Sequence, residues 1–158
     1  MNVSVELFRH HRWANDGLFA LCEGLDEHQL EATAAGTMGS IRDTLLHIAN
    51  TERFCISAIR NEPIEPRRTE FPGVAALREQ MRHHGDALVE LVQSVPDDAV
   101  WTGQWAGVTS IPLQSFFTQA INHATDHRSQ VMTILAQLGI ETPNLDGWAF
   151  HRSQLERP

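Results

Sequence analysis

The sequence contains no tyrosine, only two cysteines and no long apolar run. None of its apolar stretches approaches the roughly 18 residues needed to cross a bilayer, so we expect no membrane partner. The beginning of the sequence is polar and charged, which argues against a secretory signal and predicts a soluble, cytoplasmic protein. Cys22 and Cys55 each lie inside an apolar helical pattern. This setting favours two buried, reduced thiols over a disulfide or a catalytic thiol.

Basic residues are also scarce, with 12 Lys and Arg against 20 Asp and Glu, which gives a formal net charge of −8. A chain of this charge repels nucleic acid on average, and the sequence has no stripe of Lys and Arg that would form a positively charged binding surface. We therefore expect no nucleic-acid partner. Histidine, by contrast, is abundant, with nine copies in 158 residues. Because histidine is the commonest metal ligand, this abundance makes metal binding the chemistry to search for.

The length and an apolar content of 42% predict one domain, residues 1–158, with a substantial core. Four segments carry helical periodicity with an apolar seam, and they cover residues 3–25, 40–59, 73–95 and 110–138. Four amphipathic helices of this length predict an all-α four-helix bundle. The predicted seams contain, in chain order, Leu7, His11, Ala14, Leu18, Leu21 and Leu25; Ile41, Leu45, Ile48, Glu52, Cys55 and Ile59; Leu77, Met81, His84, Leu88, Leu91 and Val95; Leu113, Phe117, Ala120, Ala124, His127, Val131, Ile134 and Leu138.

Helix ends and linkers have their own signals. Ser40, with Asp43 three residues later, predicts a capped start for the second helix. Ser110 is the predicted cap of the fourth helix, with Pro112 in its first turn and Gly139 as its stop. The connection between the second and third helices is long, polar and rich in proline. The alternation in VWTGQW predicts a small β-hairpin before the fourth helix.

In the fourth helix, AINHATDHRSQV places His123 and His127 four residues apart. Side chains at this spacing share a helix face, so two imidazoles can converge on one ion. Spacing alone leaves open a hydrogen-bonded core histidine beside a flanking one. His47, within TLLHIANTE of the second helix, lies next to the apolar seam and needs a partner when buried. A metal, a backbone carbonyl or a water molecule could each satisfy it.

These motifs together resemble the DinB/YfiT family of small helical proteins. The likeness spans most of the chain: WAN early in the first helix, the second-helix histidine, HxxxHR-x-Q, and LG followed by Pro and LD near the end. The resemblance implies a four-helix bundle with a long connection between the second and third helices. It also implies a three-histidine metal site that maps onto His47, His123 and His127. The chain departs from the family pattern at Ser129, where glycine is usual, and serine is the better helix former.

Other polar residues are weaker candidates. Glu52 interrupts an apolar seam, where a carboxylate is costly without a partner. It could orient a ligand histidine, act as a base for metal-bound water, pair with an arginine or bend toward the bundle end. His11 and His84 fall on seams, and each could add a fourth metal ligand or be a hydrogen-bonded core histidine. Arg128 and Gln130 flank the histidine pair and match the family motif, so they could support the ligands or an interface.

Three neutral imidazoles leave coordination positions for water or substrate, as catalytic zinc sites do. Imidazole suits several divalent transition metals, of which we expect zinc or nickel. The resemblance implies a metal-dependent transferase, since relatives bind low-molecular-weight thiols such as bacillithiol or mycothiol, and a small electrophile would be the acceptor. A metal-dependent hydrolase and a non-catalytic metal-binding stress-response protein stay open as alternatives. Family resemblance also implies a homodimer, the commonest symmetric assembly.

Overall fold

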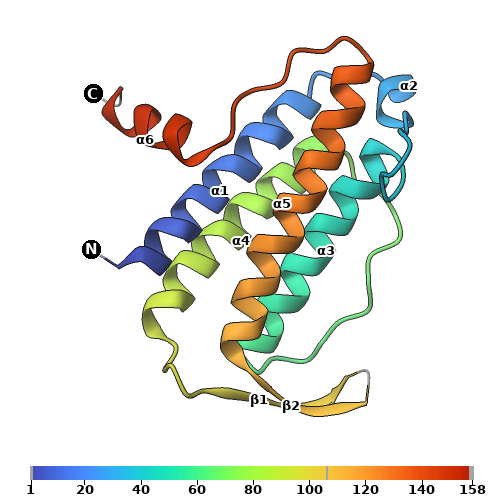
Figure 1. Cartoon of the computed structure of the whole chain (residues 1–158). Coiled ribbons are helices and arrows are strands. Elements are labelled where there is room, and N and C mark those ends of the chain that lie inside the picture. Colours follow the sequence, from blue (N-terminus) through green and yellow to red (C-terminus); the bar gives the residue numbers. More distant parts are fainter. Residues whose placement is uncertain (1, 106, 157–158) are drawn as a thin grey trace.

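The computed structural model describes residues 2–105 and 107–156. Four long helices lie side by side, and a two-stranded hairpin crosses one end of them (Figure 1). The all-α four-helix bundle predicted from the sequence is confirmed. In chain order the elements are α1 (Val3–Cys22), α2 (Glu27–Leu30), α3 (Ile41–Ile59), α4 (Val74–Ser94), β1 (Val100–Trp105), β2 (Val108–Pro112), α5 (Leu113–Gln137) and α6 (Gly147–Leu155).

The four long helices follow the order α1, α4, α3, α5 around the bundle, because α1 and α3 each contact both α4 and α5. In Figure 1, α1 and α5 run in one direction while α3 and α4 run in the other. Because α3 and α4 are parallel, the connection between them, residues 60–73, returns along the length of the bundle. Extended, these fourteen residues reach about 46 Å, more than the roughly 28 Å length of α3. This is the predicted long connection, and we call residues 60–73 the strap.

The predicted helix ends are confirmed at two places. The Ser40 hydroxyl accepts a hydrogen bond from the amide of Asp43, and the Asp43 carboxylate accepts one from the amide of Ser40. This reciprocal pair starts α3 as expected. Gly139 follows the last turn of α5 with a φ of 73°, a conformation that glycine adopts without strain. Helix α1 ends at Cys22, three residues before the expected end at 25, and the chain then turns into the short α2.

The predicted hairpin is present as the antiparallel pair β1 and β2, and it closes one end of the bundle (Figure 1). Trp101 of β1 is buried and meets Phe116 edge-on, with 6.0 Å between ring centroids. The predicted cap of α5 is wrong: Ser110 pairs with Thr102 in the hairpin, and α5 begins only at Leu113. The strand ladder extends to the residue before the helix, so it leaves no place for a serine cap.

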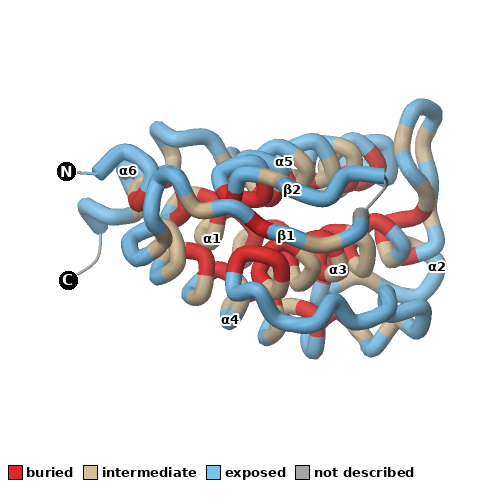
Figure 2. The backbone as a smooth tube through the Cα atoms, turned by 90° about the horizontal axis from the view of Figure 1, so that it is seen from below, coloured by how far each residue is buried: buried red, intermediate tan, exposed pale blue. Residues whose placement is uncertain are grey.

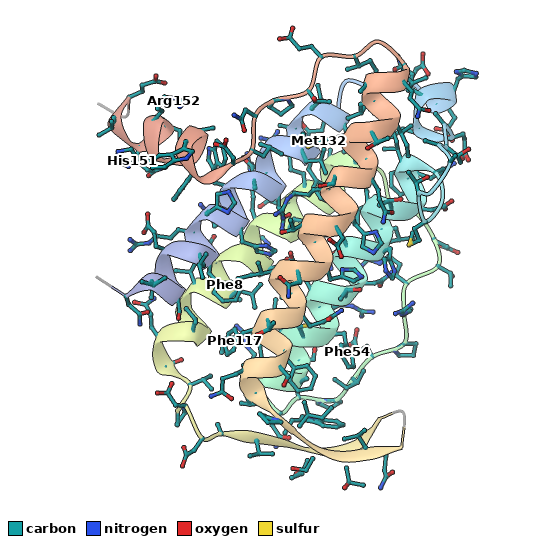
Figure 3. All side chains as sticks on the ribbon, in the orientation of Figure 1. Phe8, Phe54, Phe117, Met132, His151 and Arg152 are labelled. Carbon is teal, nitrogen blue, oxygen red and sulfur yellow. The ribbon has the colours of Figure 1, made fainter. Side chains whose placement is uncertain are left out.

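The buried core consists of two apolar clusters. One contains Leu18 and Ile48 and lies toward α2, and the other contains Phe8 and Phe117 and lies toward the hairpin. Phe8 and Phe117 meet edge-on with 5.4 Å between ring centroids (Figure 3). Figure 2 shows that the buried residues, in red, lie on the inward sides of the helices.

A layer of buried polar side chains separates the two apolar clusters. Along α1, His11 and Asn15 come after Phe8 of one cluster and before Leu18 of the other, and Glu52 has the corresponding place on α3. The exposed fractions of His11, Asn15 and Glu52 are each 1%. We call these three residues the polar layer.

Two predicted seam positions are wrong. Leu7 is 50% exposed and Leu138 is 37% exposed, while Phe8 and Leu135 are buried in the same turns. The predicted seam has a period of 3.5 residues, and a straight helix drifts from this period by about 20° per heptad. The drift accumulates toward the ends of long helices, where both errors lie. The predicted seam of α3 is buried throughout.

The C-terminal tail forms α6, which packs against α1. Phe150 is buried there, with its ring centroid 5.5 Å from that of Trp13. In the part of the chain that the structure describes, no helix combines the length and the apolar character needed to cross a membrane.

Candidate metal centre

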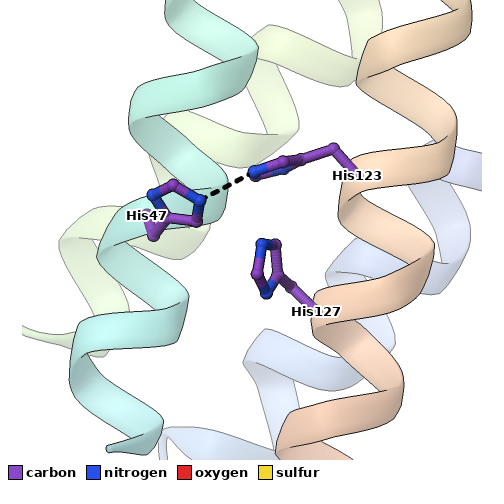
Figure 4. Close-up of side chains that lie close together, drawn as sticks. All are labelled: His47, His123 and His127. Atoms are coloured by element: carbon purple, nitrogen blue, oxygen red, sulfur yellow. Dashed lines mark hydrogen bonds between the residues drawn. The ribbon is translucent and has the colours of Figure 1, made fainter. Parts of the chain in front are cut away.

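Three histidines from two helices point toward one another between α3 and α5. His123 and His127 lie one turn apart on α5, and His47 faces them from α3 (Figure 4). The distances between ring centroids are 4.4 Å for His123 and His127, 4.6 Å for His47 and His123, and 4.8 Å for His47 and His127. Because α3 and α5 are neighbours in the bundle, residues far apart in sequence meet here. The structure thus brings together the three residues that spacing and resemblance singled out.

The ring nitrogens of this histidine cluster suit a shared divalent ion. One nitrogen from each ring lies within 4.8 Å of the others, and the Nε2 atoms of His47 and His123 are 2.8 Å apart. Two imidazole nitrogens at about 2.1 Å from one tetrahedral ion lie roughly 3.4 Å apart, so small adjustments of the rings would let all three reach one ion. Among residues 2–105 and 107–156, no other group of three histidine, cysteine or acidic side chains gathers so closely. The cluster could therefore hold a metal ion.

The electrostatics of the cluster favour the neutral form of the imidazoles of His47 and His123. Burial, followed by the neighbouring His127 and His47, lowers the pKa of His123 to about 4. Burial is also the largest cause of the lowered pKa of His47, with His127 and Arg67 adding to it. Histidine binds a metal only in its neutral form, so these shifts favour the ligand state at neutral pH.

Polar contacts orient two of the three rings. His127 Nδ1 donates to Gln130 Oε1 at 3.1 Å, and the backbone amide of Met38 donates to the same oxygen at 2.9 Å. With Nδ1 protonated, the Nε2 atom of His127 is left as the ligand atom. The hydroxyl oxygen of Thr51 lies 3.3 Å from His123 Nε2. Gln130, predicted from its place in the motif, thus contacts the cluster directly.

A pocket of about 560 Å³ opens beside the cluster and has His123 and Thr51 in its wall. The rest of the wall comes from α3, the strap, β2 and the first half of α5. Phe54 lies on the part of α3 nearest the hairpin (Figure 3). A cavity of this size accommodates a small organic molecule. Apolar side chains of the wall are Phe54, Ile64, Ile111 and Phe116, and charged ones are Arg53, Glu65 and Arg67.

Glu52 belongs to the polar layer. Its Oε1 atom accepts hydrogen bonds from His11 Nε2 at 2.6 Å and from Asn15 Nδ2 at 2.7 Å, while Oε2 lies 3.8 Å from His84 Nδ1. The structure shows a buried carboxylate partnered by a histidine and an asparagine, which is none of the alternatives that the sequence left open. Within the described residues, the hydrogen bonds of Glu52 reach none of the three clustered histidines, and His11 and His84 lie outside the cluster.

Arg128 is buried and contacts the polar layer, although it directly follows a cluster histidine in sequence. Its Nη1 atom donates to Asn15 Oδ1 at 2.6 Å, and Nη2 donates to Thr125 Oγ1 at 2.9 Å. Burial lowers the pKa of Arg128 to about 10, and the negative charge of Glu52 acts in the opposite direction. Asn15 therefore links the guanidinium group to the carboxylate of Glu52.

Sequence reasoning missed several polar residues around the site. Asn15 follows His11 by four residues, a spacing that could have indicated a shared face. Asn50 and Arg53 are three residues apart on α3, and both line the pocket. Arg67 lies in the irregular strap, where no periodicity indicates which way a side chain points.

The comparisons with known proteins agree with this architecture and settle the family. A family model described as the DinB family matches residues 1–158. The chain belongs to the DinB family. The resemblance stated from the motifs is thereby confirmed, and a possible metal site formed by three histidines is consistent with it.

Two solved structures resemble this DinB-family chain. A DinB-like protein from Bacillus cereus matches with a TM-score of 0.63 at 18% identity, over 84% of this chain and 90% of that one. A DinB-like protein from Bacillus subtilis matches with a TM-score of 0.63 at 15% identity, over 92% of this chain and 99% of that one. At these identities the likeness concerns the fold. The comparison with curated proteins gives no match.

Proposed function

We propose that this DinB-family protein is a divalent-metal-dependent thiol transferase that acts on small electrophiles. Zinc or nickel would be bound by His47, His123 and His127. The observation that carries the proposal is a cluster of three histidines, one of which, His123, lines a pocket of about 560 Å³. Three histidine ligands leave positions for a substrate, which distinguishes catalytic from structural zinc sites.

The chemistry follows from the donor set. A bound divalent cation lowers the pKa of a coordinating thiol, and the thiolate is the nucleophile. In the transfer, the thiol sulfur forms a bond to an electrophilic carbon, the leaving group departs with its electron pair, and the thiol proton passes to solvent. The family resemblance supports a low-molecular-weight thiol as the donor.

The protein's own residues bind and orient. The pKa shifts keep the imidazoles of His47 and His123 neutral, and Gln130 holds the ring of His127. The apolar side chains of Phe54 and Phe116, with 5.9 Å between their ring centroids, give the electrophile a surface that excludes water. These residues position the reactants, which lowers the entropic part of the reaction barrier.

A non-catalytic metal-binding protein is the second candidate, and the surroundings of Glu52 favour it. This carboxylate accepts hydrogen bonds from His11 and Asn15, so it is occupied within the polar layer. The chain also has no tyrosine to act as a base. A hydrolase needs a base to activate water more than a thiol transferase does, so the same observation weighs against a hydrolase.

Metal content is the first test. Protein purified without a histidine tag should contain a stoichiometric divalent transition ion by elemental analysis. The variants His47→Ala and His127→Ala should lose it, whereas His83→Ala, whose side chain is 72% exposed on α4, should keep it. Retention of the ion by both cluster variants would contradict the proposed ligands.

Turnover separates the two candidates. Metal-loaded protein should accelerate the reaction of 1-chloro-2,4-dinitrobenzene with at least one member of a panel of low-molecular-weight thiols, followed by absorbance. His123→Ala should remove the acceleration, and His83→Ala should retain it. If no thiol gives a rate above that of the metal ion alone in buffer, the transferase is excluded and the non-catalytic reading stands.

A further inference from the structure

We propose that Arg67 is the anion-binding residue of the pocket, so that the pocket takes a small molecule with an apolar body and one negatively charged group. The inference rests on the proposed function in that it names the substrate class of the same pocket. It depends on three observations: the strap is fixed on both sides of Arg67, no carboxylate pairs with Arg67 among the described residues, and four apolar side chains line the same pocket.

Arg53 fixes the strap before Arg67. Its Nη2 atom donates to the carbonyl oxygen of Pro66 at 2.5 Å, and its Nη1 atom donates to Glu65 Oε2 at 2.7 Å. Both bonds start from α3, which is a rigid element of the bundle. The backbone immediately preceding Arg67 is therefore tied to α3.

Asn50 fixes the strap after Arg67. Its Nδ2 atom donates to the carbonyl oxygen of Arg68 at 2.9 Å, and its Oδ1 atom accepts from the backbone amide of Arg68 at 3.0 Å. One amide side chain thus satisfies both backbone groups of a single strap residue. With Pro66 and Arg68 both held, the position of Arg67 between them is set before any ligand arrives, which reduces the entropy lost on binding.

The charges of the pocket are not balanced. Arg53 is neutralised by Glu65, but no carboxylate pairs with Arg67 in the part of the chain that the structure describes. Arg67 lies in the wall of the same pocket as His123 of the histidine cluster. The pocket is thus locally positive in a chain with a net charge of −8. Such a site attracts anions.

The apolar residues of the pocket wall determine the rest of the ligand. Phe54, Phe116, Ile64 and Ile111 present apolar surface, and about 560 Å³ is enough for a fused two-ring aromatic body with a short polar substituent. Arginine binds carboxylate, sulfonate and phosphate groups through its forked N–H donors. The substrate class is therefore an aromatic or similarly apolar anion, and a neutral molecule of the same shape binds less well.

The chain offers a matched control at the next residue. Arg68 carries the same charge in the same strap, but its Nη1 atom donates to Gln80 Oε1 on α4 at 3.1 Å, and it is not part of the pocket wall. Replacing Arg68 therefore changes the net charge as much as replacing Arg67 does, without removing the cation that faces the pocket.

Titration of the full-length, ¹⁵N-labelled protein by NMR tests the proposal with 2-naphthoate and its neutral analogue 2-naphthamide. The metal-free protein is used first, because its result does not depend on whether the histidines bind a metal. Naphthoate should bind about fivefold to tenfold more tightly than naphthamide, as expected for a partly exposed charge-assisted pair. The shifted amides should include those of Asn50, Ser57 and Gln119 in the pocket wall.

The preference for naphthoate should disappear in Arg67→Gln and persist in Arg67→Lys and Arg68→Gln. The affinity for naphthamide should be the same in all four proteins. A preference that survives in Arg67→Gln, shifts confined to other surfaces, or no binding of either probe would overturn the proposal. If the preference appears only after zinc is added and is insensitive to Arg67→Gln, the anion is held by the metal and Arg67 is not the anion-binding residue.

Discussion

A carboxylate that is 1% exposed carries an electrostatic cost that its neighbours must offset. For Glu52, two hydrogen bonds from His11 and Asn15 offset the cost of burying the carboxylate. The positive charge of Arg128, which is hydrogen-bonded to Asn15, contributes as well. Removing one member of such a buried polar group lowers the stability of the fold more than replacing the whole group by apolar residues does. The reason is that the remaining donors stay buried without acceptors.

Glu52→Ala should therefore reduce the free energy of unfolding by about 3 kcal/mol, measured by urea denaturation at pH 7. The exposed carboxylate of Glu90 on α4 provides the control, and Glu90→Ala should change stability by less than about 0.5 kcal/mol. Equal stability of the two variants would show that the polar layer contributes nothing to folding.

Two glycines at helix ends differ in whether the backbone conformation requires glycine. Gly139 has a φ of 73°, and a Cβ added there meets nothing within 4 Å. Gly147, the first residue of α6, also has open space around an added Cβ but lacks a positive φ. The two glycines thus differ in conformation and not in available space.

Gly139→Ala should destabilise the protein by about 1 kcal/mol, because alanine is strained in the left-handed conformation. Gly147→Ala should be neutral or slightly stabilising, since alanine is the better helix former there. Thermal unfolding of both variants, followed by circular dichroism, checks the difference. Equal melting temperatures would contradict the conformational explanation.

The pairing of α1 with α4 includes a charged cluster at Asp16. Arg78 Nε and Arg82 Nε each lie 2.8 Å from Asp16 Oδ1. Burial by itself raises the pKa of Asp16, but the two arginines outweigh it and the net pKa is lowered from the usual 3.8. The folded state therefore prefers the ionised carboxylate more than the unfolded chain does.

A lowered pKa in the folded state means that the stabilisation is fully present above pH 3.8 and is lost as the pH falls through the lower folded-state value. The stability of wild-type protein should therefore fall more steeply below pH 4 than that of Asp16→Asn. Urea denaturation midpoints between about pH 3 and pH 6 measure this. Parallel curves for the two proteins would contradict a role for the ionised carboxylate.

At the scale of the whole molecule, the histidine cluster connects two helices that are distant in sequence. An ion that binds only the folded chain stabilises it by mass action, by about 2.7 kcal/mol when the free ion exceeds its dissociation constant 100-fold. Zinc should thus raise the melting temperature of metal-free protein by roughly 5 to 10 °C, and excess EDTA should reverse the change. His47→Ala combined with His127→Ala should abolish the response, and an undiminished response would place the ion elsewhere.

Periodicity was sufficient for much of the fold. The four long helices, the hairpin and the capped start of α3 were predicted, because each follows from local apolar spacing or from a turn signal. Ser110 was misassigned because pairing with Thr102 is a contact between two strands, which a local reading does not detect. Leu7 was placed inside the bundle by an idealised period.

The candidate site was only partly accessible to sequence reasoning. The pair His123 and His127 has a local signal, whereas His47 was assigned through family resemblance. The pocket wall formed by the strap could not be predicted, because hydrogen bonds from Asn50 and Arg53 to backbone groups of an irregular segment leave no pattern in the sequence. Whether the protein forms the expected homodimer stays a prediction.

The polar layer has a consequence for how accurately the helices align. Sliding α1 by one turn, about 5.4 Å, would bring His11 and Asn15 level with apolar side chains and leave Glu52 without donors. Apolar packing tolerates several such offsets, but only the observed one brings His11 and Asn15 within hydrogen-bond distance of Glu52 Oε1. His47 and Glu52 share α3, and His127 and Arg128 are adjacent on α5, so the same offset sets the three imidazoles opposite one another. Side chains that touch no ligand thus determine the relative height of the helices, and with it the positions of the three histidines in every folded molecule.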